Sequence, residues 1–297
     1  MKHGTTKNTE LHGDFCDSPC QLITQSFKKK IMEQTVAFAG SIPANYERYL
    51  GPFLFEPYAL DMVSRLQDKK YDEILEIACG TGRVTAHLAT SVRHDTLTAT
   101  DLNPDMINVA KEIIHDKNIK WMPADAMELP FAEYSFDLVV IQFGVMFFPD
   151  KEKGLKEAYR VLKPGGKLIF NTWNKVETVP AIHAGRQIIE SYFGDNPPVF
   201  YNIPFSMYDE KELRTLAASA GFKNVRTELV KKEGISPSAS DLSKGIVEGN
   251  PVYLAICERM PSLINTIKEH VQKVIAEKFG DNPVKSPLQA WVVEGIK

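Results

Sequence analysis

The segment from Asp72 to Asp101 constrains the fold of this chain more than any other part of it. An apolar run of strand length ends at Gly80-Thr-Gly82, a helical pattern begins near Val84, and a second short apolar run stops at Asp101. A strand, a glycine turn, a helix, a second strand and a terminal acid are typical of the βαβ unit that binds nucleotides. The sequence therefore predicts an α/β fold with a ligand at the glycine turn.

Two residues near this turn argue against a dinucleotide ligand. The third glycine of the G-x-G-x-x-G pattern is replaced by Thr85, and Glu76 lies four residues before Gly80. A carboxylate at that place would repel a pyrophosphate. It would favour the sulfonium and ammonium groups of S-adenosylmethionine, which carries no phosphate. Asp101 can accept hydrogen bonds from both ribose hydroxyls, and a nicotinamide-dependent dehydrogenase is the weaker interpretation.

Four short motifs carry a family resemblance. Glu76-x-x-Cys-Gly-Thr-Gly82 resembles motif I of the class I S-adenosylmethionine-dependent methyltransferases, and Thr100-Asp-Leu-Asn-Pro-Asp-Met106 resembles motif II. Lys120 to Phe131 resembles motif III, and Leu162-Lys-Pro-Gly-Gly166 is a marker of the same family. The resemblance covers residues 70 to 175 and is to the methyltransferase type 11 group, similar to the ubiquinone/menaquinone-biosynthesis C-methyltransferases. It implies a Rossmann-like, doubly wound, mostly parallel seven-stranded sheet with an antiparallel last strand and a helical cap.

The same resemblance implies S-adenosyl-L-methionine as the cofactor and indicates which residues contact it. In the family, the residue after the motif II acid covers the adenine, and the motif III acid accepts a hydrogen bond from the adenine amino group. The end of the fourth strand lies beside the methionine moiety. The cofactor-binding residues expected on this basis are Glu76, Ala78, Gly80, Thr81, Gly82, Asp101, Leu102, Asp125, Ala126 and Gln142.

An aromatic stretch follows the fourth predicted strand, which spans residues 135–142. Because the carboxyl ends of parallel strands form the ligand crevice, Phe143, Met146, Phe147 and Phe148 are candidates to line a methyl-transfer pocket, with one or two of them belonging to the core.

In the resembling family, the segment before the first strand folds over the cofactor as a lid. Tyr46, Arg48 and Tyr49 are therefore candidates to touch cofactor or substrate, the alternative being that they attach the next helix to the core. That helix is expected to open at Pro52 and to run to Leu66.

The chain is divided on these patterns into a core and a cap. Residues 1–67 are expected to form a tail and lid helices, and residues 68–175 the cofactor-binding core. Residues 176–208 form a cap insertion, 209–235 continue the core, 236–282 form a helical cap insertion, and 283–297 form the last strand. A turn is expected at 163–166, and strands at 167–173, 223–230 and 289–297.

Composition sets limits on partners and location. The 297 residues carry a formal net charge of −3, which gives no general attraction for nucleic acid or an anionic membrane. The sequence shows no apolar run of membrane-spanning length and no secretory signal, and its four cysteines suggest no disulfide framework. A reduced, cytoplasmic protein is expected, as a monomer or homodimer. Cys16-x-x-x-Cys20 lacks the third cysteine of a radical-enzyme iron–sulfur motif.

The catalytic residues stay unassigned at this level. Methyl transfer depends on alignment of the nucleophile and the methyl group, and it needs a side-chain base only when the acceptor must lose a proton. His183 is the only histidine of the expected cap that is near the expected crevice, which makes it a candidate base, and a structural role is its alternative. No cluster has metal-ligand spacing. We expect a methyltransferase acting on a small, partly apolar molecule at carbon or oxygen. The alternatives are a methyltransferase of RNA or protein and a non-catalytic S-adenosylmethionine-binding protein.

Overall fold

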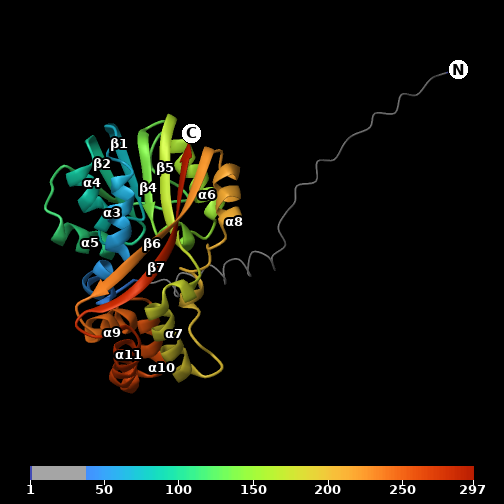
Figure 1. Cartoon of the computed structure of the whole chain (residues 1–297). Helices are drawn as coiled ribbons and strands as arrows, with labels where there is room; N and C mark the ends of the chain where they lie inside the picture. The colour runs from blue at the N-terminus through green and yellow to red at the C-terminus, as the bar shows by residue number, and fades with distance from the viewer. Residues whose placement is uncertain (2–37) are drawn as a thin grey trace. The chain divides into compact units, whose positions relative to one another are not determined.

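Seven strands form one sheet in the order β3-β2-β1-β4-β5-β7-β6 (Figure 1). The computed structural model describes residues 38–297 and Met1, and the statements below concern these residues. Strands β1 to β5 pair in parallel, and β7 is antiparallel to both β5 and β6, as expected. The strands are β1 Tyr71–Ile77, β2 His94–Asp101, β3 Ile119–Pro123, β4 Phe136–Gln142, β5 Leu162–Trp173, β6 Lys223–Ser236 and β7 Val284–Ile296.

The chain reverses its direction of travel across the sheet between β1 and β4. From β1 it steps outward through β2 to β3, and it then returns to β4 and steps outward on the other side to β5. Right-handed crossovers in opposite directions place the connecting helices on opposite faces. Ligands of such sheets bind beyond the carboxyl ends of the strands at the point of reversal. We call this region the carboxyl edge; it includes Ala78, Asp101, Gln142 and Trp173.

Three helices of the core begin at a capping side chain. Asn103 caps the helix after β2 through a 2.9 Å hydrogen bond to the amide of Asp105, and Asp150 and Asp209 cap two later helices in the same way. Helix α3 packs beside α4, and α6 beside α8. The core helices are α3 Glu56–Ser64, α4 Arg83–Ser91, α5 Pro104–Ile113, α6 Lys151–Val161 and α8 Glu210–Ser219.

The expectation that a helix opens at Pro52 is wrong. The helical segment begins ten residues earlier, with α2 Ile42–Asn45, and continues through the π-helical η1 Tyr46–Phe55 into α3, so Pro52 lies inside it. Proline lacks the amide hydrogen that an α-helix interior needs and clashes with the preceding turn. The segment around Pro52 adopts a π-helical register in place of an α-helical one. One face of this segment is apolar and packs into the core, where Leu54, Tyr58, Met62 and Leu66 are all buried.

Strand β5 also differs from expectation. It already begins at Leu162, and the predicted turn at residues 163–166 is an irregularity within it, where the register with β4 shifts and Gly165 has a φ of 78°. The amide of Gly165 and the carbonyl of Gly166 both hydrogen-bond the backbone of Lys297 at the end of β7. The expected turn residues are therefore held in the sheet by the last residue of the chain.

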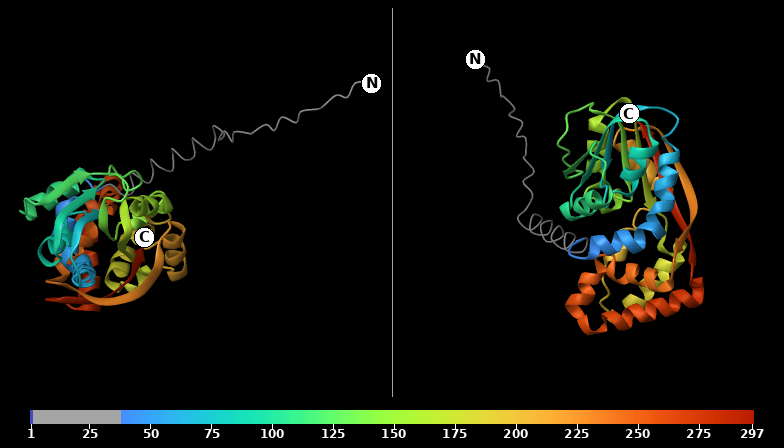
Figure 2. Two further views of the ribbon diagram at one scale, coloured as in Figure 1. Left: turned by 90° about the horizontal axis from the view of Figure 1, so that it is seen from above. Right: turned by 90° about the vertical axis from the view of Figure 1, so that its left-hand side faces the viewer.

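Four helices gather at one end of the sheet and form the cap (Figures 1 and 2). They are α7 Pro180–Phe193, α9 Ala239–Glu248, α10 Val252–Arg259 and α11 Ile264–Phe279. Helix α11 packs on α7 and α9, and α9 packs on η1. Single-turn helices η2 Val145–Phe147, η3 Val176–Thr178, η4 Phe200–Asn202 and η5 Pro261–Leu263 lie in the connections.

Strands β6 and β7 are longer than the sequence predicted. Strand β6 ends at Ser236 instead of residue 230, and β7 begins at Val284 instead of residue 289, with Ser236 paired to Val284. The extra residues run beside the cap, and Gly234 approaches η1 so closely that a Cβ there would lie 2.7 Å from the carbonyl oxygen of Phe53. The extended ends of β6 and β7 therefore connect the cap to the core.

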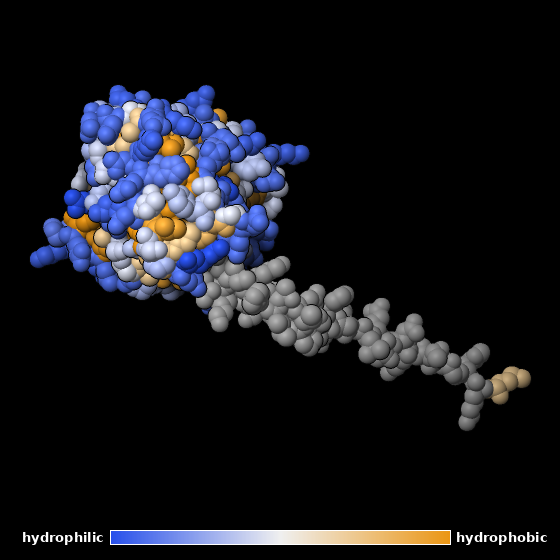
Figure 3. All heavy atoms as spheres, turned by 90° about the horizontal axis from the view of Figure 1, so that it is seen from below, coloured by the Kyte–Doolittle hydropathy of each residue, from blue (hydrophilic) through white to orange (hydrophobic). Residues whose placement is uncertain are grey.

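The face seen from below carries small hydrophobic areas between hydrophilic ones (Figure 3). No helix in residues 38–297 is long and apolar enough to cross a membrane. The predicted amino-terminal tail and the pair Cys16 and Cys20 lie outside the described residues.

Candidate functional site

The glycine turn has the geometry that its sequence predicts. Gly80 and Gly82 have φ values of 56° and 82°, in the left-handed region that favours glycine. A side chain at Gly82 would also meet Ile114, whose Cδ1 lies 2.6 Å from the position of a Cβ. Gly82 begins α4, so the unpaired amides of that helix face the carboxyl edge. Thr81 lies between the two glycines and is buried.

Asp101 holds the turn from the neighbouring strand. Its carboxylate accepts hydrogen bonds from the amide of Gly80 at 2.9 Å and from the amide of Asn103 at 2.8 Å. Burial raises the pKa of Asp101, and these two amides oppose the rise. Each carboxylate oxygen has a second lone pair, so Asp101 can accept two further hydrogen bonds.

Glu76 is a buried carboxyl group at the end of β1, with an exposed fraction of 1%. The hydroxyl of Thr85 donates to its Oε2 at 2.6 Å, so the residue that replaces the third glycine holds the glutamate in place. Burial raises the pKa of Glu76 to about 8, the Thr85 hydrogen bond lowers it, and the charge of Asp101 raises it further. A cation beside Glu76 would restore its ionised form.

Two non-glycine residues have left-handed backbones at the reversal point. Ala78 follows β1 with a φ of 55°, and Phe143 follows β4 with a φ of 49°. The amide of Phe143 donates to Oδ1 of the buried Asn171 at 2.8 Å. A Cβ at Gly144 would lie 2.7 Å from the Cβ of Ala78. Backbone strain of this kind concentrates at functional sites, and here it lies directly after the adjacent strands β1 and β4.

Helix η1 is fastened to the glycine turn by an ionic cluster. Glu47 accepts a hydrogen bond from the Thr81 hydroxyl at 2.5 Å and pairs closely with Arg83. Arg83 also pairs with Glu56 at 2.9 Å, and Glu56 reaches His87 at 2.8 Å. The segment before β1 therefore covers the glycine turn directly.

The outer part of the carboxyl edge carries the remaining predicted residues. Leu102 is 71% exposed although it is apolar, while Ala126 is buried. Asp125 accepts a hydrogen bond from the amide of Met127 at 2.8 Å through one oxygen. The amide of Ala124 bonds the carbonyl of Asp101 at 3.0 Å, which brings the segment after β3 next to the end of β2. At the end of β4, the Gln142 carboxamide donates to the carbonyl of Phe55 at 3.1 Å.

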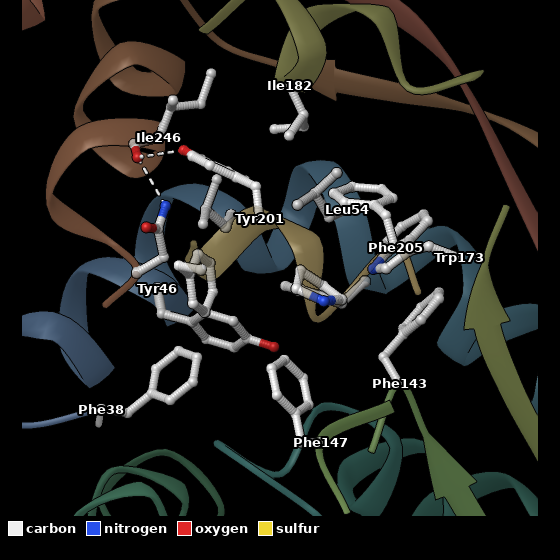
Figure 4. A pocket seen from close by; sticks show the side chains of 15 residues that line it. Phe38, Tyr46, Leu54, Phe143, Phe147, Trp173, Ile182, Tyr201, Phe205 and Ile246 are labelled. Atoms are coloured by element: carbon white, nitrogen blue, oxygen red, sulfur yellow. Dashed lines mark hydrogen bonds between the residues drawn. The ribbon is translucent and has the colours of Figure 1, made fainter. Parts of the chain in front are cut away.

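An aromatic cavity, partly open to solvent, lies between the cap and the carboxyl edge (Figure 4). Nine of its fifteen lining residues are aromatic, and among the described residues no charged side chain lines it. The ring of Phe143 stacks on Trp173 with centroids 4.0 Å apart and planes 11° apart. Tyr46 stacks on Phe55 at 4.8 Å. Tyr46 lines the cavity from η1, which is bonded to the glycine turn through Glu47 and Thr81.

The predicted pocket residues divide between cavity and core. Phe143 and Phe147 line the cavity, whereas Met146 and Phe148 are buried elsewhere. Tyr46 lines the cavity; Arg48 and Tyr49 do not.

His183 is half-buried next to a lining residue, Ile182, but is not itself part of the lining. Its Nδ1 is buried without a hydrogen-bond partner. The structure therefore gives His183 no direct access to the cavity, which argues against a role as base there.

Sequence reasoning missed several residues of this region. Nothing in the sequence singles out Glu47 as the partner of Thr81 and Arg83, or Asn171 as the acceptor for the Phe143 amide. Tyr201 and Asn250, which line the cap side of the cavity, come from connections without a motif. The only available signal was the aromatic run around Tyr46. Within residues 38–297, no group of three metal-ligating side chains is close enough to hold a metal ion.

Comparison with known proteins identifies the family. Residues 58–195 match the model of the ubiE/COQ5 methyltransferase family. A demethylmenaquinone methyltransferase of Staphylococcus haemolyticus is 30% identical over 223 residues, covering 69% of this chain and 91% of the relative. The enzyme of the same name from Staphylococcus aureus is 31% identical over 213 residues, covering 65% of this chain and 87% of the relative.

Solved structures of low sequence identity share the fold. The phosphoethanolamine N-methyltransferase 2 of Haemonchus contortus, in complex with S-adenosyl-L-methionine, matches with a TM-score of 0.54 at 18% identity, covering 86% of this chain and 56% of that one. The YcgJ protein of Bacillus subtilis matches with a TM-score of 0.53 at 17% identity, covering 81% and 98%. The motifs and the relatives agree on S-adenosylmethionine as the cofactor. The chain belongs to the ubiE/COQ5 methyltransferase family and is a class I S-adenosylmethionine-dependent methyltransferase.

Proposed function

We propose that the enzyme transfers the methyl group of S-adenosylmethionine to a carbon or oxygen atom of a small, partly apolar acceptor held in the aromatic cavity. The observation that carries this proposal is the uncharged aromatic lining next to the carboxyl edge. Apolar pockets with a few polar groups are the usual sites of small ligands. A flat, neutral ring fits this lining because aromatic rings stack or pack edge-on.

In this proposal the cofactor lies along the carboxyl edge from the adenine side to the cavity. Leu102 covers the adenine, which gives its exposed side chain an apolar partner, and Asp125 and Ala126 contact the same ring. Asp101 accepts the ribose hydroxyls with its free lone pairs. The methionine moiety lies beside Gln142 and the group formed by Glu76, Ala78, Gly80, Thr81 and Gly82.

The buried Glu76 supports this orientation. A carboxyl group with a raised pKa gains from a nearby cation, because the ionised form is then favoured. The ammonium group of the cofactor supplies such a cation without a phosphate to be repelled. The sulfonium then faces Tyr46 and Phe143, where the cavity begins.

The chemistry requires alignment and a dry site. The acceptor atom attacks the methyl carbon, the bond from carbon to sulfur breaks, and S-adenosylhomocysteine and a proton leave. Stacked walls such as Phe143 on Trp173 hold a flat acceptor against the methyl group. The Tyr46 phenol stays protonated at neutral pH, because burial raises its pKa well above the ordinary value, so it offers no phenolate to act as a base. An acceptor with its own acidic hydroxyl needs no side-chain base.

A quinol-like ring is the acceptor class that fits best. The similar enzymes of Staphylococcus are named for demethylmenaquinone, and such a ring is flat, apolar and neutral. An RNA or protein acceptor is less well supported, since the chain has a net charge of −3 and the cavity lies under a cap.

Transfer of a labelled methyl group tests the proposal. The full chain is incubated with methyl-labelled S-adenosylmethionine and 1,4-dihydroxynaphthalene, and label is counted in the organic extract. The variant Ile182→Phe narrows the cavity, and Ile113→Phe makes the same change at a 52% exposed site on α5. We expect labelled organic product from the wild type and Ile113→Phe, and at least tenfold less from Ile182→Phe. Label confined to protein or RNA, or equal transfer by both variants, would contradict the proposal.

A further inference from the structure

The cap side of the cavity holds a small polar cluster in otherwise apolar surroundings. Tyr201 and Asn250 line the cavity and are 3% and 6% exposed. Both donate to one acceptor, the carbonyl oxygen of Ile246, from the Asn250 carboxamide at 2.7 Å and from the Tyr201 hydroxyl at 3.4 Å (Figure 4). One carbonyl oxygen on α9 thus serves two buried donors.

The cluster retains unused hydrogen-bonding capacity. The bond from Tyr201 is long for a hydroxyl donor, whose usual distance is near 2.8 Å, so it can be redirected at little cost. The carboxamide nitrogen of Asn250 carries two hydrogens, and the shorter bond to Ile246 uses one. The Oδ1 of Asn250 is already engaged by the amide of Val252 at 3.1 Å. Two N–H or O–H donors can therefore turn toward a ligand in the cavity.

The cluster lies at the end of the cavity opposite to the carboxyl edge, where the proposed function places the methyl group of the cofactor. Tyr201 lies in η4 and Asn250 follows α9, both on the cap side, whereas Phe143 lies at the carboxyl edge. Figure 4 shows Tyr201 and Ile246 on the side of the cavity away from Phe143. A flat acceptor that presents one end to the methyl group presents its other end to the cluster.

We infer that Tyr201 and Asn250 determine specificity by binding a neutral oxygen-bearing substituent, a hydroxyl or a carbonyl, at the end of the acceptor remote from the methylated atom. This inference rests on the proposed function, because it assigns the cavity to the acceptor. A pure hydrocarbon would cover these donors and leave them without hydrogen-bond acceptors, which would weaken its binding. A charged substituent would find no counter-charge in the lining.

The cluster stays neutral across the physiological range. Burial raises the pKa of the Tyr201 phenol well above its ordinary value, against smaller effects of Asn250, Glu190 and Arg186. Arg186 lies outside the lining, with its guanidinium 5.9 Å from the centre of the Tyr201 ring. The phenol is therefore a hydrogen-bond donor to the substituent at any pH at which the enzyme works.

The test compares 1-naphthol with naphthalene, which differ by one hydroxyl group. Their affinities are measured by fluorescence titration of the full chain saturated with S-adenosylhomocysteine. The variant Tyr201→Phe removes only the cluster hydroxyl. Tyr192→Phe is the matched control, since its hydroxyl bonds His270 at 3.2 Å on an exposed part of the cap. One neutral hydrogen bond corresponds to a preference of roughly five- to tenfold.

We expect the wild type and Tyr192→Phe to prefer 1-naphthol by that factor. In Tyr201→Phe the preference should fall to within twofold, with naphthalene bound as before. The inference would be overturned if the wild type bound 1-naphthol no more tightly than naphthalene. It would also be overturned if Tyr201→Phe kept the wild-type preference for 1-naphthol. The titration measures binding and needs no methyl transfer. If the preference for 1-naphthol depends on Tyr201 but no quinol is methylated, the proposed reaction is refuted and the inference about Tyr201 stands.

Discussion

The buried carboxyl group of Glu76 predicts an unusual dependence of stability on pH in the cofactor-free enzyme. Its pKa rises from 4.5 to about 8 because the group is buried beside Asp101, and the Thr85 hydroxyl opposes this only in part. The folded state therefore holds a proton that the unfolded state releases. The contribution of Glu76 is fully present below about pH 4.5 and is lost as the pH rises through about 8.

The size of this loss of stability follows from the difference between the pKa values of Glu76 in the folded and unfolded states. Each pH unit between the unfolded and folded pKa values costs about 1.4 kcal/mol. Over the interval from about pH 5 to pH 8 the loss approaches 4 kcal/mol, as an order of magnitude. The substitution Glu76→Gln removes the titration but retains an oxygen that can accept from Thr85. The free energy of unfolding of this variant should match the wild type near pH 5 and exceed it by several kcal/mol near pH 8.

Urea unfolding at several pH values measures this directly. Other titrating groups are common to both proteins, so they cancel in the difference between wild type and Glu76→Gln. If the unfolding free energies of wild type and Glu76→Gln stayed within about 1 kcal/mol of each other from pH 5 to pH 8, the pKa of Glu76 would not be raised. Binding of S-adenosylmethionine to the wild type near pH 7 should release a proton from Glu76, whereas the variant should bind more weakly and release none, as measured by calorimetry in buffers of different ionisation enthalpy.

Three further substitutions probe the site. Asp101→Asn should weaken S-adenosylmethionine binding about tenfold, since it replaces a charged acceptor by a neutral one; a calorimetric change below twofold would contradict the ribose role. Gly144→Ala places a Cβ 2.7 Å from that of Ala78 and should cost about 1–3 kcal/mol of unfolding free energy, so an unchanged urea midpoint would oppose this packing. Glu47→Gln weakens the pair with Arg83 and should speed hydrogen exchange in residues 42–55; unaltered exchange there would show that the pair does not hold the lid.

The parts of the fold that the sequence predicts well are those fixed by neighbouring residues. The glycine turn, the Asn103 cap and the apolar strands β1 and β4 follow from local patterns, because each depends on backbone geometry or on burial of both faces of a strand. The helix through Pro52 differs from the prediction, because proline is common in the first turn of a helix and a π-helical register has no simple sequence signal. The extended ends of β6 and β7 were missed because their pairing is to each other across the cap insertion.

The acceptor side of the site could not be predicted in the same way. Glu47 meets Thr81 across 34 positions in the chain, and Tyr201 meets Ile246 across 45. Such contacts depend on how the cap is placed on the sheet, which no local pattern specifies. His183 was a reasonable candidate by chain position, but the direction of its side chain is set by the packing of α7 against α9 and α11.

A crystal structure of the enzyme with S-adenosylhomocysteine and 1,4-dihydroxynaphthalene tests the central claim most directly. The proposal predicts the thioether sulfur at the mouth of the aromatic cavity between Tyr46 and Phe143, with the ring of the acceptor stacked within the cavity and one of its carbon or oxygen atoms facing the sulfur. A sulfur atom directed away from this cavity, or an acceptor bound elsewhere on the surface, would contradict it.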